Sequence, residues 1–165
     1  MVTALRTDSI TYTINWVVLY DKPEGYQEKF LEFCKDFITK YEFPNVDIEI
    51  QEFKTGGLIF NKELTKMLAI SFKRSQFKYL GIYFRAQQFG KAIYFSMLES
   101  VDRNFWFMDK VRTREEIKAD IRRKCKNLAQ WEEYNTLSIL GVLTFWNAMK
   151  EFDSNLDKNL KIYLY

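Results

Sequence analysis

Apolar and polar side chains alternate between residues 10 and 20. The even positions carry isoleucine, tyrosine, tryptophan and valine, whereas Thr11, Thr13 and Asn15 are polar. A two-residue period of this kind predicts a β-strand with one buried face. Because Val17 and Leu19 interrupt the polar side, we expect the end of this strand to be covered on both faces.

Apolar residues take up helical spacing in the segment that follows this strand. They recur every three or four residues as far as Tyr41, and charged residues occupy the positions between them. This pattern predicts an amphipathic helix. Asp21 and Glu24 have the spacing of a capping box, so we expect the helix to begin there. Pro44 closes the segment.

Two further helices are predicted in the second half of the chain. Thr113 and Glu116 form another capping-box pattern, and apolar residues follow at helical spacing as far as Leu128. The next segment, from about Tyr134 to Phe152, is apolar nearly all round. A helix without a polar face must be enclosed in the domain or buried against a partner.

Alternating segments between the helices predict additional strands. They span residues 46–51, 58–60, 67–73, 77–86, 91–98, 105–108 and 160–165. The short links between 67–73, 77–86 and 91–98 allow only antiparallel pairing. We therefore expect a single α+β domain over residues 1–165, with a largely antiparallel sheet of five to seven strands and three helices packed mainly on one face.

Composition sets broad limits on this domain. The chain has 165 residues, 47% of them apolar, so it can bury a core without disulfides or metal. Its net charge of +3 is too small to indicate nucleic acid by itself. Cys34 and Cys125 lie on or near apolar stripes, so we expect buried free thiols. Neither a signal peptide nor a transmembrane segment is predicted. We expect a cytoplasmic (intracellular) protein with no membrane contact.

The chain contains no histidine, which removes the usual general base near neutral pH and the commonest zinc ligand. Glycine-rich phosphate loops and the nucleophile elbow are also missing from the sequence. We therefore expect no enzyme, no cofactor and no metal. The catalytic alternative is a metal-dependent nuclease, because acids beside a lysine on a strand can hold magnesium; its residues would be Asp47, Glu49, Glu52 and Lys54. A solvated strand face is the competing interpretation.

One face of the predicted meander combines tyrosine with positive charge and points away from the helices. Its candidate binding residues are Lys73, Tyr79, Tyr83, Arg85 and Tyr94. Bases can stack on tyrosine rings while lysine and arginine contact phosphates. Tyrosine and arginine are also enriched at protein interfaces. A purely structural role is the third interpretation, because tyrosine favours strands.

Basic residues also gather on the helix predicted after Thr113. Lys118, Arg122 and Lys126 recur every four residues, which predicts a ridge of positive charge along one side of that helix. Such a ridge suits a phosphate backbone or an acidic protein. The alternative is a solvated helix back with internal ion pairs.

Together these patterns predict a non-catalytic binding module that uses the tyrosine- and arginine-rich sheet face. A protein partner or a homodimer is favoured over nucleic acid, and the apolar helix over 134–152 is a further candidate for dimerisation. Binding of single-stranded nucleic acid or RNA, through the same face and the basic helix, is the first alternative. The metal-dependent nuclease is the second.

Overall fold

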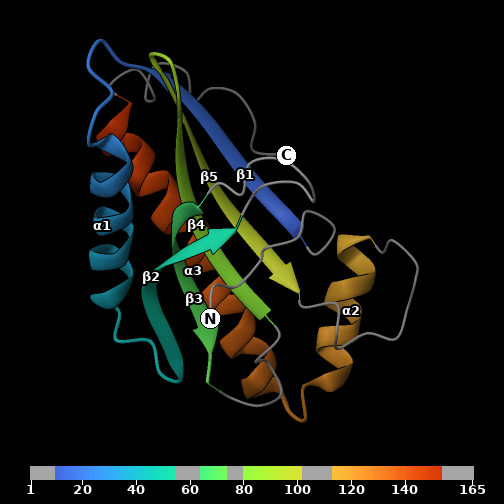
Figure 1. Ribbon diagram of the computed structural model, residues 1–165. Helices are drawn as coiled ribbons and strands as arrows, with labels where there is room; N and C mark the ends of the chain where they lie inside the picture. The colour runs from blue at the N-terminus through green and yellow to red at the C-terminus, as the bar shows by residue number, and fades with distance from the viewer. Residues whose placement is uncertain (1–9, 55–63, 74–79, 102–112, 154–165) are drawn as a thin grey trace.

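The computed structural model describes residues 10–54, 64–73, 80–101 and 113–153 (Figure 1). Their elements follow in the order β1 (Ile10–Leu19), α1 (Tyr26–Thr39), β2 (Val46–Lys54), β3 (Leu64–Phe72), β4 (Leu80–Phe89), β5 (Ala92–Val101), α2 (Arg114–Lys124) and α3 (Leu128–Phe152). The strands form a five-stranded sheet in the order β1-β5-β4-β3-β2, and every neighbouring pair is antiparallel. The predicted α+β class with an antiparallel sheet is confirmed.

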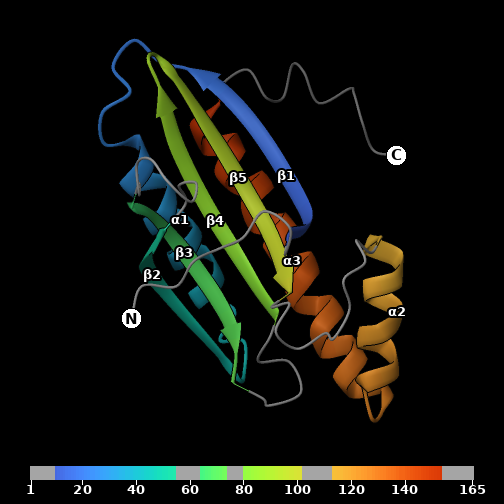
Figure 2. The same ribbon diagram turned by 45° about the vertical axis from the view of Figure 1, so that its right-hand side comes forward.

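The meander predicted from short links is present as β3, β4 and β5. Gly90 has a φ of 60° in the turn between β4 and β5, a conformation that glycine adopts without strain. β1 joins the sheet beside β5, and α1 carries the chain from there to the opposite edge, where β2 begins (Figure 2). The strands predicted over 58–60, 105–108 and 160–165 lie outside the described residues.

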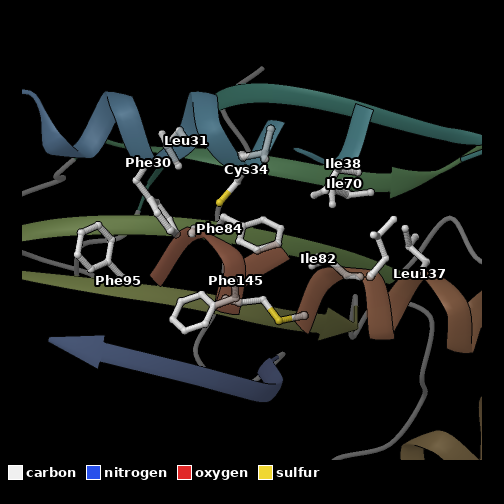
Figure 3. Close-up of a cluster of buried hydrophobic side chains, with 14 of the residues drawn as sticks. Phe30, Leu31, Cys34, Ile38, Ile70, Ile82, Phe84, Phe95, Leu137 and Phe145 are labelled. Atoms are coloured by element: carbon white, nitrogen blue, oxygen red, sulfur yellow. The ribbon is translucent and has the colours of Figure 1, made fainter. Parts of the chain in front are cut away.

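The main core lies between the sheet and two helices, α1 and α3 (Figure 3). Phe30 of α1 is fully buried, with its ring centre 4.9 Å from that of Phe95 on β5 and 6.4 Å from that of Phe145 on α3. Burial of such aromatic rings is the main source of stability in a core of this kind. The prediction of three helices on one face is confirmed in part, because α2 lies beside α3 at one end of the sheet (Figure 2).

The start of α1 differs from the prediction. Gly25 precedes the helix with a φ of 80°, and no side chain caps it. Instead, the carbonyl of Pro23 accepts a hydrogen bond from the Tyr26 amide in a turn. The capping box predicted at Asp21 and Glu24 is therefore wrong, because this turn delays the first helical residue to Tyr26.

The capping box of α2 is confirmed. The Thr113 side chain accepts from the Glu116 amide, and the Glu116 carboxylate accepts from the Thr113 amide, at 3.2 and 2.8 Å. The boundary that follows was not predicted. Cys125 is extended and ends α2, and Asn127 then caps α3 by accepting from the Gln130 amide at 3.0 Å. As a result α3 begins at Leu128 rather than near Tyr134.

Both cysteines are free thiols in this fold. Cys34 is fully buried in α1, and Cys125 is half-buried. Burial raises the pKa of both thiols above the ordinary value, most strongly for Cys34. They therefore stay protonated near neutral pH and are poor nucleophiles. Among the helices that the structure describes, none combines the length and apolarity needed to cross a membrane.

Candidate functional site

The candidate site lies on the outer face of the sheet, which we define as the face turned away from α1 and α3. Ile82, Phe84 and Phe95 belong to the core beneath the sheet, so the alternation of strand residues sends Tyr83, Arg85 and Tyr94 to the outer face. The predicted division of the strands into two faces is correct. The pairing of Arg85 with Ser96 and of Gln87 with Tyr94 makes Arg85 and Tyr94 diagonal neighbours on adjacent strands.

Tyr83 packs into a second, smaller apolar cluster on the outer face. Its ring meets that of Phe53 edge to face, with centres 5.4 Å apart, and buried Met67 and Ala69 complete the cluster. Side chains in such a cluster are held by packing. Tyr83 therefore has a structural role, in addition to any part it takes in binding.

Arg85 and Ser96 carry polar atoms with unused hydrogen-bonding capacity. Arg85 Nε and Ser96 Oγ are both buried, and neither has a hydrogen-bond partner within the described part of the chain. The two residues are also paired across β4 and β5. A buried donor without a partner costs about 1–3 kcal/mol. Native proteins keep few such groups, and each one calls for an explanation.

An exposed apolar surface lies at the hairpin end of the outer face. We define it as the hairpin patch: Val17, Leu19, Phe89 and Tyr94. Leu19 and Phe89 both pair with Ala92, and Val17 pairs with Tyr94, so the patch spans three strands. The exposed fractions of Val17, Leu19 and Phe89 are 56%, 77% and 59%. The expectation that the end of β1 is covered on both faces is therefore wrong. No described element packs over these side chains.

The middle of the outer face is less accessible to solvent than the hairpin patch. Met67, Ser96 and Leu98 are buried there, whereas Arg85 and Tyr94 are half-buried. The predicted tyrosine platform is therefore accessible only in part. The open portion of the outer face is the hairpin patch. Of its four residues, Tyr94 was predicted as a binding residue, whereas Val17 and Leu19 were expected to be covered.

Lys73 does not join this part of the face. It follows β3 near the opposite edge of the sheet, and its Nζ lies 2.9 Å from Asp47 Oδ1 on edge strand β2. This ion pair compensates its charge, although an exposed pair of this kind adds only about 0–1 kcal/mol of stability. Tyr79 lies outside the described residues.

The basic ridge predicted after Thr113 is interrupted. α2 ends at Lys124, so Lys126 lies in the link to α3, where its amide donates to Gln130 Oε1 at 2.7 Å. Lys118 is part of α2, but its side chain is not among those described. Arg122 places its guanidinium 5.9 Å from the centre of the Trp131 ring. Figures 1 and 2 both show α2 away from the β4–β5 hairpin, so these residues and the hairpin patch do not form one surface.

The acidic residues of β2 do not converge. β2 pairs with β3 in an unbroken register from Val46 to Lys54, so Asp47 and Glu52 point to opposite faces of the sheet. They cannot hold one metal ion together. Among the described residues, no group of three or more acidic or cysteine side chains is placed to bind a metal.

Two polar features were not predicted from the sequence. A hollow of about 460 Å³ lies between α1 and the ends of β3 and β4, where the Lys66 ammonium and the Glu28 carboxylate are 3.7 Å apart. Glu99 is buried on the helix side of β5 and accepts a hydrogen bond from Ser138 of α3. Each feature joins residues from distant segments, so no local pattern could have indicated it.

Comparisons with known proteins do not assign this chain to a family. No protein-family model, curated protein or solved structure matches it.

Proposed function

We propose that this chain is a non-catalytic protein-interaction domain that binds through the hairpin patch and the neighbouring Arg85. The observation that carries the proposal is the exposure of Val17 and Leu19 on β1 and of Phe89 on β4, on either side of β5 at the hairpin end of the outer face. Apolar side chains grouped on a surface in this way are typical of protein contact sites.

Arg85 adds polar specificity to this surface. It lies diagonally next to Tyr94, and its buried Nε has no partner within the described part of the chain. A partner that brings a carboxylate or carbonyl oxygen to this position would satisfy the donor, and arginine and tyrosine are the residue types enriched at interface centres. The partner chemistry we expect is an apolar segment beside a hydrogen-bond acceptor.

Site-specific photo-crosslinking in the native cell tests the proposal. A photo-reactive phenylalanine analogue at Phe89 should give discrete protein adducts, and Arg85→Glu should weaken them. The matched control is the same analogue at Tyr41, which is also exposed but lies after the end of α1. If Phe89 and Tyr41 give the same adducts, the hairpin patch is not a binding surface and the proposal is wrong.

Nucleic acid is the second candidate ligand, and the cluster of Tyr83, Arg85 and Tyr94 is the observation that favours it. Single-stranded nucleic acid binding to aromatic and basic side chains weakens steeply with salt. Fluorescence anisotropy with a labelled single-stranded RNA should then show binding that salt reverses and that Arg85→Glu and Tyr94→Ala remove. Binding that is absent at low salt would eliminate this candidate.

A further inference from the structure

β1 is an edge strand of the sheet that the structure describes; α2 contacts it, but its own sequence lacks the charges and prolines that commonly protect such edges. Its segment, Ile10–Leu19, contains no charged residue and no proline. The opposite edge strand, β2, carries Asp47, Glu49, Glu52 and Lys54. Charged residues on an edge strand discourage pairing with another chain, whereas a long uncharged edge strand favours it. The two edges of this sheet therefore differ in their capacity to accept another strand.

An apolar stripe on α3 lies next to this edge. We define the α3 stripe as Ile139, Val142, Leu143 and Trp146, which share one side of the helix by their spacing. Trp146 contacts Trp16 of β1 edge to face, with ring centres 5.8 Å apart. The exposed fractions of Ile139 and Leu143 are 59% and 47%. No charged residue occurs between 134 and 149. The stripe therefore continues the uncharged surface of β1 beneath the sheet.

We propose that β1 pairs with β1 of a second copy of this chain, so that the α3 stripes of the two copies approach each other beneath the joined sheet. The pairing would be antiparallel about a two-fold axis, the commonest symmetry of protein dimers. In such an arrangement each strand meets its own sequence in reverse. The absence of charge on β1 then matters directly, because a charged residue near the axis would face a like charge.

The two faces of β1 also match themselves in this arrangement. Ile14, Trp16 and Val18 pack against the core side, whereas Thr13, Asn15 and Val17 lie on the outer face. Antiparallel pairing of two identical strands can keep like faces together, so the core-side residues of one copy continue the core side of the other. This inference rests on the proposed function, in which the chain is a protein-interaction domain. It adds that a second copy of the chain is the partner that binds at the β1 edge.

Sedimentation velocity of the full chain over a wide concentration range tests the proposal. We expect a monomer–dimer equilibrium, and we expect Val17→Lys and Ile139→Glu each to raise the dimer dissociation constant by at least about tenfold, because each places like charges across the two-fold axis. Both side chains are exposed, so both variants should fold, which circular dichroism checks. Ile50→Lys is the matched control, because it adds a charge to the opposite edge strand and should leave the equilibrium unchanged.

Three results would overturn the proposal. The first is a wild-type chain that stays monomeric at every concentration. The second is a dimer that Val17→Lys and Ile139→Glu leave intact. The third is a monomeric wild type that dimerises only after removal of residues 154–165, which would assign the β1 edge to the chain's own C-terminal segment. Adducts at Phe89 with a different protein would persist in all three cases if the hairpin patch binds as proposed, so the two proposals can fail separately.

Discussion

Replacement of Arg85 by methionine should make the protein more stable while it weakens binding. Arg85 Nε and its cross-strand neighbour, Ser96 Oγ, are buried without hydrogen-bond partners in the described part of the chain. Most substitutions at half-buried positions destabilise a protein. A gain in stability here would indicate that the arginine is retained for a reason other than folding.

The size of the gain follows from the unpaired groups. A buried donor without a partner costs about 1–3 kcal/mol, and methionine removes it while it keeps a long flexible apolar side chain in the same place. We therefore expect Arg85→Met to raise the free energy of unfolding by about 1 kcal/mol. Ser96→Ala removes a second buried polar atom and should add a gain of similar size, although adjacent substitutions need not be additive.

Urea denaturation followed by circular dichroism measures these changes, because the midpoint shifts with stability at constant slope. Arg122→Met is the matched control. Its guanidinium lies over the Trp131 ring, so the same substitution there should lower the free energy of unfolding by up to about 1 kcal/mol. A loss of stability in Arg85→Met greater than that of the control would refute the reasoning, since it would mean that the Arg85 guanidinium is already satisfied within the folded chain.

Three further predictions test the described fold. Phe30→Ala should lower the free energy of unfolding by about 3–5 kcal/mol in urea denaturation, because the ring is fully buried among other aromatic rings; a loss below about 1 kcal/mol would contradict this packing. Thr113→Ala should destabilise α2 by about 0.5–2 kcal/mol, seen as faster amide exchange in α2 but not in α3. Burial raises the pKa of Tyr20 above the ordinary value of 10.0, so the folded state holds this proton more tightly than the unfolded state. Stability should therefore fall as the pH rises above 10.0, and Tyr20→Phe should reduce that alkaline loss in urea midpoints measured across this range.

Local periodicity predicted much of this fold. The alternation in β1 and in the meander correctly divided the strand residues between two faces, and short links correctly required antiparallel pairing. The capping box at Thr113 was also found, because it depends on residues three positions apart. These features are determined by neighbours in sequence, which is why a pattern could reveal them.

Competition between local signals explains the wrong boundaries. Asp21 and Glu24 have capping spacing, but the turn at Pro23 and the positive φ of Gly25 take precedence and start α1 at Tyr26. Asn127 and Gln130 form the cap of α3, yet the apolar period running through Leu128 concealed the break between two helices. A side chain suited to capping was present at both helix starts, but only that of Asn127 is used.

Exposure could not be predicted, because it depends on what packs above a residue. Val17 and Leu19 are apolar, and apolar residues on both sides of a strand usually indicate burial on both faces. The structure instead places their strand at the edge of the sheet, with both side chains exposed. Residues of a buried core and residues of an exposed apolar surface therefore give the same apolar pattern, and the sequence alone does not distinguish them.

The position of the hairpin patch relative to the β1 edge links the two proposals. Val17 and Leu19 belong both to the patch and to the strand that would pair with a second copy. In a dimer joined through β1, the patches of the two copies would lie on the same face of one continuous sheet. A partner with two matching segments would then bind both patches at once, and its apparent affinity would exceed that for a single patch. Ile139→Glu should therefore weaken binding of such a partner although it changes no residue of the patch, whereas a partner that engages one patch alone should be unaffected.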